Sequence, residues 1–370
     1  MSRRQQPTLW GKTPGRRVPV FLATRILDRL PGILATLRKG QPIEIVTDRT
    51  VNAMFAGPLE DVLCGSGWLV NRTVLGVGEK IKSARTVASL HERWFELGYD
   101  RRTTVVALGG GTVGDTAGFA AATFLRGLPF WQIPTTIVGQ VDAALGGKVG
   151  INHPRGKNLI GCFCQPQGVI IDPQMLTTLP KRERRSGLAE VVKYGVIGDR
   201  RLFGLCEQNL DAWVAGDLPV RADVIERCVR AKLRIVEHDE TDTGRRHVLN
   251  FGHTLGHALE RWTGYRGLRH GEAVALGMYA AGSIALKRGY WSEDEFARLA
   301  SLCHSLRPVR PLGAFVPEEI IGHLAVDKKR SAGRNVWILP RAIGTVELFN
   351  DVTEKEIKSS LSHLAQWMEE

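Results

Sequence analysis

Hydrophobic residues in the first half of the chain fall into short runs bounded by glycine, proline or acidic residues. These runs predict strands at residues 43–47, where apolar and polar residues alternate up to Asp48, and at 103–108, 130–134 and 168–171. Helices are predicted at residues 84–98, where apolar side chains recur at helical spacing, and at the alanine-rich residues 115–125. Strands that alternate with helices favour a parallel α/β sheet.

The pattern changes after Leu179-Pro180. Helical spacing then predominates, in the segments 183–214, 221–238, 250–262, 271–288 and 293–305. We therefore expect an N-terminal leader with a first strand at 1–40, an α/β domain at 41–180 and a mostly α-helical domain at 181–370. A ligand site is expected in a cleft between the two domains.

Composition places the chain among ordinary globular proteins, with 43% hydrophobic and 24% charged residues in 370. No apolar run approaches the roughly 18–20 residues that cross a bilayer. The basic N-terminus lacks the apolar stretch of a secretory signal. The six cysteines include no CxxC pair, which favours reduced thiols and a cytoplasmic location.

The formal net charge of +12 would attract either nucleic acid or small polyanions. The basic residues occur in clusters along the whole chain, and no base-reading helix, zinc finger or aromatic-basic repeat accompanies them. The sequence therefore favours small anionic ligands, with nucleic-acid binding as the lesser alternative.

Three glycines form a G-x-G-x-x-G pattern between a predicted strand and a predicted helix: Gly109, Gly111 and Gly114. Such a turn lets the backbone and the helix N-terminus approach a pyrophosphate. A purely structural turn would look the same, and no acidic residue closes a strand about twenty residues later, as in the common dinucleotide fold. Asp48, at the end of the earlier strand, could hold the ribose instead.

A polar loop follows from Pro134 to Lys148 and continues through Asn152-His153-Pro154 and Gly156-Lys157-Asn158. Thr, Asp, Lys and Asn interrupt an otherwise apolar passage and have glycines on either side. Lysines set among glycines suit phosphate contacts. We interpret the passage as a ligand loop in preference to a solvated surface loop.

Histidines cluster near the predicted starts of helices in the C-terminal domain. His253 and His257 are four residues apart and share one helix face, His270 precedes the next helix, and Glu190 lies on an earlier one. Three protein ligands with open positions are typical of catalytic zinc. Spacing alone does not tell which histidine is not a ligand.

These motifs, in their order and spacing, resemble the 3-dehydroquinate synthase family over residues 43–345. The matching segments are GEKIKS (78–83), ALGGGTVGD (107–115), GFAAATFLRG (118–127), PTTIVGQVDAALGGKVGINHPRGKNLIG (134–161), QPQGVIID (165–172), TLP (178–180), GLAEVVKYG (187–195), LNFGHTLGHALE (249–260), HGEAVALGM (270–278) and DKKR (327–330). The resemblance implies a dehydroquinate synthase-like fold, with an NAD-binding α/β domain before a metal- and substrate-binding helical domain.

The resemblance also implies roles for individual residues. The metal ligands, for zinc or cobalt, would be Glu190, His253 and His270. The NAD contacts would be Asp48, Glu79, Lys82, Gly110, Gly111, Asp115, Thr135, Thr136, Lys157 and Thr178. The substrate contacts would be Arg126, Asp142, Lys148, Asn158, Lys193, Lys232, Arg246, Asn250, His257 and Lys328. The catalytic candidates are Lys148, Lys193, Asp242, Asn250 and His257. Arg126 would act from a neighbouring subunit, so a homodimer is implied.

The family's enzymes are carbon-oxygen lyases of the shikimate pathway to aromatic amino acids. They convert 3-deoxy-arabino-heptulosonate 7-phosphate to 3-dehydroquinate and phosphate. The resemblance implies that NAD oxidises the C5 alcohol, phosphate is eliminated, the hydride returns, and an intramolecular aldol reaction closes the ring. A site of Lys, Arg and Asn suits a ligand with a carboxylate and a phosphate.

The match has departures and leaves alternatives open. Asp242 stands where the family has a glutamate, Arg245 replaces an apolar residue, Cys164 replaces an aromatic residue or histidine, and residues 1–40 show little resemblance. Related cyclases of the amino-dehydroquinate or sedoheptulose 7-phosphate type form one alternative. A metal-dependent alcohol dehydrogenase of the glycerol dehydrogenase type forms a second, and a basic binding or scaffold protein a third.

Overall fold

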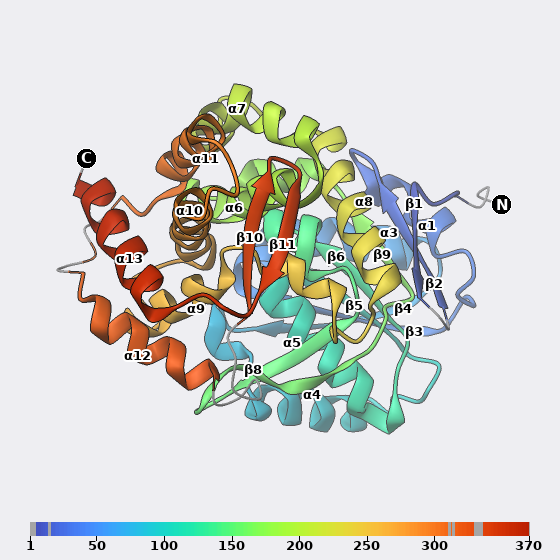
Figure 1. Cartoon of the computed structure of the whole chain (residues 1–370). Coiled ribbons are helices and arrows are strands. Elements are labelled where there is room, and N and C mark those ends of the chain that lie inside the picture. The colour runs from blue at the N-terminus through green and yellow to red at the C-terminus, as the bar shows by residue number, and fades with distance from the viewer. Residues whose placement is uncertain (1–4, 14–15, 310–311, 313–314, 329–335, 370) are drawn as a thin grey trace. The chain divides into compact units, whose positions relative to one another are not determined.

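The computed structural model describes residues 5–13, 16–309, 312, 315–328 and 336–369 (Figure 1). The chain divides into two compact units. Unit 1 comprises residues 1–178 together with 220–241, and unit 2 comprises 179–219 together with 242–370. The expected combination of a parallel α/β sheet followed by a helical region is confirmed.

Unit 1 is built on a seven-stranded sheet in the order β1-β2-β9-β6-β5-β3-β4 (Figure 1). The strands are β1 Leu9–Thr13, β2 Arg16–Leu22, β3 Pro42–Asp48, β4 Leu69–Leu75, β5 Thr104–Gly109, β6 Phe130–Pro134 and β9 Gly168–Ile171. β1 and β2 pair antiparallel, and the other neighbours pair parallel. The predicted strands are therefore the inner strands β3, β5, β6 and β9, whose apolar side chains are buried on both faces.

Helices cover both faces of this sheet because its side chains alternate between them. Val106 and Leu108 of β5 join one core cluster, which includes Leu59 and Leu63 of α3 Gly57–Gly65. Their neighbours in β5 join the other cluster, with apolar residues of α4 Ala84–Glu96 and α5 Gly111–Thr123. The shorter helical segments are η1 Ile26–Arg29, α1 Leu30–Ile33, α2 Arg49–Val51, η2 Asn52–Ala56, η3 Glu79–Ile81, η4 Phe124–Arg126, η5 Gly139–Ala143 and η6 Pro173–Thr178.

The passage interpreted as a polar ligand loop contains an antiparallel hairpin, β7 Lys148–His153 and β8 Gly156–Phe163. Gly150 and Gly161 allow the two strands to cross closely, because a Cβ on Gly150 would come within 2.6 Å of the Ile160 carbonyl oxygen. Polar residues of the passage thus stand on a paired ribbon with a defined register.

Unit 2 is mainly helical. Its elements are α6 Lys181–Gly198, α7 Arg200–Ala215, η7 Arg245–Asn250, α9 His253–Trp262, α10 His270–Lys287, α11 Glu293–Leu306, α12 Pro317–Lys328, the antiparallel hairpin β10 Trp337–Ala342 and β11 Thr345–Phe349, and α13 Glu354–Glu369. Every residue of α10 from Gly271 to Ala285 is buried, against α6, α9, α11 and α13. None of the helices in the described part of the chain combines the length and apolarity needed to cross a bilayer.

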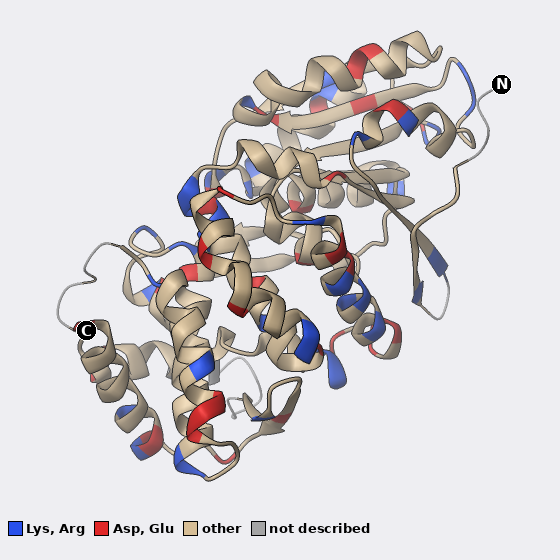
Figure 2. Cartoon of the chain, turned by 90° about the horizontal axis from the view of Figure 1, so that it is seen from above, with Lys and Arg blue, Asp and Glu red and all other residues tan. Residues whose placement is uncertain are grey.

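Charged side chains are distributed over many elements. Figure 2 shows Lys and Arg on helices, strands and loops of the described chain, with Asp and Glu among them. Some basic residues are held by neighbouring carboxylates, as Arg288 is by Glu356 at 2.6 Å and Arg298 is by Glu207 at 2.7 Å.

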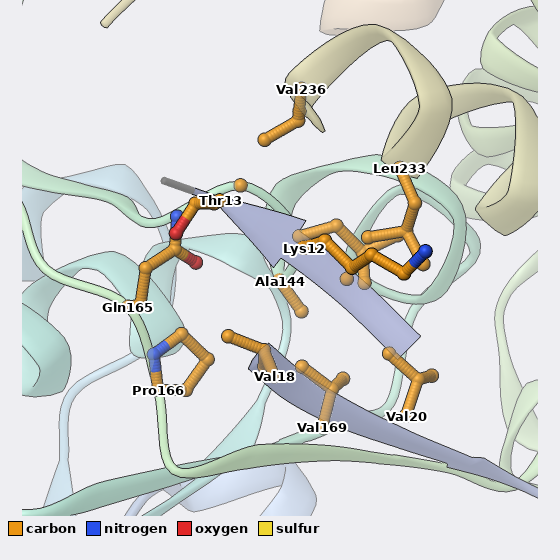
Figure 3. Close-up of a pocket in the computed structure, with 13 residues that line it drawn as sticks. Lys12, Thr13, Val18, Val20, Ala144, Gln165, Pro166, Val169, Leu233 and Val236 are labelled. Atoms are coloured by element: carbon orange, nitrogen blue, oxygen red, sulfur yellow. The ribbon is translucent and has the colours of Figure 1, made fainter. Parts of the chain in front are cut away.

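The helix α8 Ala222–His238 corrects one expectation. Its residues were expected in the helical C-terminal domain, but the structure packs α8 within unit 1, against β1 and η5. Leu233 and Val236 of α8 face Val18, Val20 and Val169 across a small apolar pocket (Figure 3). Helical spacing identified the helix, but the partner of its apolar face depends on the tertiary fold.

Candidate active site

Three helices of unit 2 bring a carboxylate and two imidazoles together. Glu190 on α6, His253 at the start of α9 and His270 at the start of α10 place their ligand atoms within 4.8 Å of one another. The Nε2 atoms of His253 and His270 lie 3.5 and 3.4 Å from Glu190 Oε1. Glu190 is 1% exposed. One carboxylate and two imidazoles are a donor set that suits zinc or a similar divalent ion.

Glycines let the three helices approach this closely. A Cβ on Gly271 would overlap the backbone of Ser186 on α6, and a Cβ on Gly277 would overlap the Gly252 carbonyl before α9. The Ser186 hydroxyl also accepts a hydrogen bond from the Gly271 N–H at 3.0 Å. The contact between Gly271 and Ser186 lies next to His270 on α10 and about one turn from Glu190 on α6, so it holds these two ligand residues close together.

The outer nitrogens of both histidines face oxygen acceptors. His253 Nδ1 lies 3.1 Å from the Phe251 carbonyl, and His270 Nδ1 lies 3.1 Å from Glu260 Oε2. Because these oxygens only accept, each Nδ1 carries a hydrogen, and Nε2 is the nitrogen of each ring that can bind a metal ion once it has no proton. The residues thus fit a metal ion in both donor chemistry and tautomer.

The protonation of the two imidazoles follows from their surroundings. Burial lowers the pKa of His253 to about 3, so this ring is neutral at pH 7. Burial acts in the same direction on His270, but hydrogen bonds to Glu190 and Glu260 outweigh it and raise the pKa of His270 to about 10. The carboxylates around His270 therefore favour a positive charge, either a proton or a metal ion.

Other expected site residues of unit 2 lie around this group. Lys193 is 1% exposed and forms an ion pair with Glu190 one turn earlier. His257 is exposed on α9, with its ring centroid 5.4 Å from that of His253. Arg246 and Asn250 lie on η7, which contacts α6, and Arg246 is 2% exposed.

Two more expected residues of unit 2, Asp242 and Lys328, are located by their position along the backbone. Asp242 precedes η7 with a φ of 60°, a conformation that Asp tolerates better than most residues. Lys328 is the last residue of α12, and its side chain lies outside the described part of the structure, as do Lys329 and Arg330 of the DKKR segment.

In unit 1 the glycine turn leaves no room for side chains. A Cβ on Gly109 would lie 2.7 Å from Val113, one on Gly110 would lie 2.9 Å from Thr136, and one on Gly111 would lie 3.0 Å from Ala143. Gly110 is the N-cap residue of α5, so the first N–H groups of that helix point out at the turn. A compact backbone cradle with helix N–H groups fits a pyrophosphate.

Asp48 lies at the same edge of the sheet as this turn, because β3 and β5 are parallel neighbours in which Thr47 pairs with Leu108. Asp48 Oδ1 accepts hydrogen bonds from the N–H groups of Thr50 and Val51, at 2.8 and 3.0 Å. The bonds hold the carboxylate beside the turn.

A polar network connects further expected NAD contacts. Lys82 is 6% exposed, and its Nζ lies 2.6 Å from Asp115 Oδ2 and also bonds Asn158 Oδ1. Glu79 accepts a hydrogen bond of 2.8 Å from Asn152. Burial raises the pKa of Asp115, and the Lys82 ammonium opposes that rise. The network ties α5 to the β7–β8 hairpin.

The remaining expected NAD contacts all belong to unit 1. Thr135 follows β6, and its N–H bonds the Gly109 carbonyl at 3.0 Å. Thr136 accepts a bond of 3.1 Å from the Gly139 N–H. Lys157 lies on β8 and is half-buried, and Thr178 ends η6 with its hydroxyl donating to the Met175 carbonyl at 3.1 Å.

The expected substrate contacts of unit 1 include one tight pair. Lys232 of α8 donates to Asp142 Oδ1 at 2.7 Å and to the Asp142 carbonyl at 2.8 Å, and Lys232 is 5% exposed. Lys148 is exposed at the start of β7. Arg126 is exposed at the end of η4, with a φ of 67°.

Two residues beside these groups had no expected role. Glu260 was part of a matching segment, and its spacing of seven residues from His253 places it on the same helix face. Gln165 donates to Glu240 at 2.9 Å, and a Cβ on Gly147 would lie 2.8 Å from the Gln165 amide. Helical spacing could have identified Glu260. Gln165 also begins a matching segment, but its contacts with Glu240 and Gly147 depend on the fold.

Comparisons with known proteins agree with this geometry. The model described as 3-dehydroquinate synthase N-terminal matches residues 72–186, and the one described as 3-dehydroquinate synthase C-terminal matches residues 187–330. The chain is 42% identical over 348 residues to the 3-dehydroquinate synthase of Desulforamulus reducens, which covers 94% of this chain and 97% of that protein.

Two solved structures are also similar. One is ValA, a 2-epi-5-epi-valiolone synthase from Streptomyces hygroscopicus subsp. jinggangensis 5008 with NAD+ and Zn2+ bound, with a TM-score of 0.87, 31% identity, and 94% and 97% of the two chains covered. The other is 2-deoxy-scyllo-inosose synthase complexed with carbaglucose-6-phosphate, NAD+ and Co2+, with a TM-score of 0.85, 26% identity, and 96% and 99% covered.

Proposed function

The chain belongs to the 3-dehydroquinate synthase family, and from that premise we propose that it converts 3-deoxy-arabino-heptulosonate 7-phosphate to 3-dehydroquinate and phosphate. It acts as an NAD- and metal-dependent lyase of the shikimate pathway. The observation that carries the proposal is the convergence of Glu190, His253 and His270 within 4.8 Å.

We propose that these three residues hold zinc or cobalt, as two similar cyclases bind Zn2+ and Co2+. The bound ion would supply Lewis acidity that makes a substrate hydroxyl more acidic. The ligand assignment leaves His257 to contact the substrate or to move a proton. Lys193 beside Glu190 supplies a buried cation for an anionic substrate group.

The glycine turn at Gly109 to Gly111 would hold the pyrophosphate of NAD, and Asp48 would hold a ribose. NAD would accept a hydride from the substrate and later return it, so it would act as a retained catalyst. Lys82 and Asp115 are positioned by each other, and this ion pair keeps the carboxylate oriented beside the turn. Glu79, Thr135, Thr136, Lys157 and Thr178 complete the proposed set of NAD contacts.

The substrate has two anionic ends, and the proposed contacts are mainly cations and amides. The proposed contacts are, in unit 1, Arg126, Asp142, Lys148, Asn158 and Lys232 and, in unit 2, Lys193, Arg246, Asn250, His257 and Lys328. Arg246 and Asn250, with Lys328, favour a substrate with a carboxylate over the sugar phosphates without a carboxylate that other cyclases use. Asp242, whose side chain is one methylene group shorter than the family's glutamate, would orient a water molecule or a lysine.

The test is phosphate release from matched sugar phosphates, with the metal removed by chelation and then restored. We expect release from 3-deoxy-arabino-heptulosonate 7-phosphate that requires both NAD and the restored ion. A preference for the amino analogue or for sedoheptulose 7-phosphate would indicate a related cyclase. Net NADH accumulation with glycerol, without phosphate release, would overturn the proposal in favour of an alcohol dehydrogenase.

We also propose a cytoplasmic homodimer. The six cysteines all lie in the described part of the chain and form no disulfide, which suits a reducing compartment. The dimer rests on the resemblance, in which the position of Arg126 reaches a neighbouring subunit's substrate. Light scattering during size exclusion would test it, and a mass of one chain, 40.8 kDa, would exclude it.

A further inference from the structure

Glu260 is a buried carboxylate beside the metal-binding group. It lies on α9, is 2% exposed, and places Oε2 3.1 Å from His270 Nδ1. On the other side of the same ring, His270 Nε2 lies 3.4 Å from Glu190 Oε1. The imidazole therefore has a carboxylate at each nitrogen.

The two histidines differ in what holds their outer nitrogen. His253 Nδ1 faces the neutral carbonyl of Phe251, whereas His270 Nδ1 faces the charged carboxylate of Glu260. Either oxygen fixes the tautomer. A carboxylate also makes the opposite nitrogen a stronger electron donor, and such partners typically contribute about 10- to 100-fold to metal affinity.

Glu260 also belongs to a second group of possible metal ligands. His257, Glu260 and His270 also bring ligand atoms within 4.8 Å of one another, so they could hold an ion of their own. If both groups bound ions at the same time, His270 would have to bind one ion at each ring nitrogen, which requires the loss of both ring protons. A hydrogen bond from Nδ1 to Glu260 needs no such ionisation, and it agrees with the distance of 3.1 Å.

We infer that Glu260 is a positioning residue for the metal centre: it accepts the Nδ1 hydrogen of His270, directs Nε2 toward Glu190, and strengthens the bond from Nε2 to the ion. The inference rests on the proposed function, since it needs the Glu190–His253–His270 group to bind a metal. It also explains how a buried carboxylate is stabilised, because His270 gains positive character when Nε2 binds a cation.

The experiment compares zinc affinity in the full-length protein and two variants, by competition with a chromophoric chelator. Glu260→Gln keeps the size and one acceptor oxygen but removes the charge, and Glu260→Ala removes both. We expect the zinc Kd to rise about 10-fold in Glu260→Gln and up to about 100-fold in Glu260→Ala. The visible spectrum of the cobalt-loaded Glu260→Ala protein should also shift, because the orientation of His270 changes.

Glu356→Gln is the matched control, since it removes the same charge from the same unit, but Glu356 bonds Arg288, the residue after α10, instead of a histidine. Its zinc Kd should equal that of the wild type. Circular dichroism of the metal-stripped proteins establishes that each variant is folded. Should Glu260→Ala not fold, Glu260→Gln still decides the outcome.

Different failures point to different conclusions. If the wild type binds no zinc, or Glu190→Gln binds it unchanged, the proposed function is at fault. If the wild type binds zinc and both folded Glu260 variants match it within twofold, only the role of Glu260 is overturned. Two zinc ions per chain that fall to one in Glu260→Ala would also overturn it, because Glu260 would then be a ligand.

Discussion

Glu44 is a fully buried carboxylate on β3, the strand next to the edge strand β4 in the sheet of unit 1. Tyr99 donates a hydrogen bond of 2.7 Å to Glu44 Oε2, and the Thr73 hydroxyl bonds Oε1. Burial raises the pKa of Glu44 above its ordinary value of 4.5, and these hydrogen bonds only partly oppose it. The folded chain therefore holds a proton on Glu44 more tightly than the unfolded chain does.

This gives a pH dependence with a definite sign. As pH rises from 4.5 through the raised pKa, the unfolded state releases the proton first, so the free energy of unfolding falls. Glu44→Gln cannot ionise, and its stability should lack this fall. Urea unfolding at a series of pH values checks the difference, with the exposed Glu92→Gln as control. Parallel curves for wild type and Glu44→Gln would contradict the expectation.

Lys232 is a buried lysine of α8 that pairs with Asp142. Its two hydrogen bonds to Asp142 connect α8 to η5, and both side chains are proposed to contact the substrate. Lys232→Met should lower kcat/KM for phosphate release by about 10- to 100-fold, the usual effect of losing a hydrogen bond to a charged group. Lys12→Met is the control. Lys12 lies on β1 and pairs at 3.8 Å with Glu237 of α8, the helix of Lys232, and its loss should leave kcat/KM unchanged. Equal activity of both variants would remove Lys232 from the site.

At the scale of elements, the contact between α9 and α10 depends on Gly277. A methyl group there would overlap the carbonyl of Gly252, the residue before His253. Gly277→Ala should therefore destabilise the protein by about 1–3 kcal/mol and weaken zinc binding together. Gly204 is a helical glycine of the same unit with open space at its Cβ, so Gly204→Ala should stabilise by about 0.4–1 kcal/mol. Thermal melts and zinc titrations measure both variants. If Gly277→Ala kept the stability and the zinc affinity of the wild type, α9 and α10 could move apart without loss of stability.

The strands that the sequence predicted are the buried strands of the sheet. The strands β3, β5, β6 and β9 are buried on both faces and consist mostly of apolar residues, with Glu44 of β3 and Gln132 of β6 as buried polar exceptions. β4 escaped prediction because Asn71 and Arg72 lie in it, half-buried at the sheet edge. β2 contains Pro19, just before the residues that pair with β9, and polar residues at its start, and only the general location of a first strand was expected.

The candidate site was predictable to the extent that it is local in sequence. His253 and His257 are one turn apart on a helix, and the glycine turn is continuous. The pairing of Lys232 with Asp142 spans ninety residues, and that of His270 with Glu260 joins two helices. Such contacts depend on which apolar faces pack together, and helical spacing does not contain that information.

For the whole molecule, the net charge of +12 predicts how an anionic substrate is captured. A positive surface raises the association rate of a phosphate-carboxylate ligand, and salt screens this attraction. We expect kcat/KM to fall about 3- to 10-fold between low salt and about 0.5 M NaCl, while kcat changes less than about twofold. Sucrose at equal osmolality is the control. A kcat/KM that is independent of salt would show that the distributed charge does not steer the substrate.

The chain enters unit 1 twice, since residues 220–241 return to it after 179–219 have begun unit 2. On a ribosome, the first 178 residues therefore emerge without the helix that covers the apolar faces of Val18 and Val20 and that carries Lys232. At about 5–20 residues per second, the missing 63 residues (241 − 178) take roughly 3–13 s to be made. A nascent chain of this protein thus has an interval in which a chaperone, or a co-expressed peptide of residues 220–241, could occupy the position of α8.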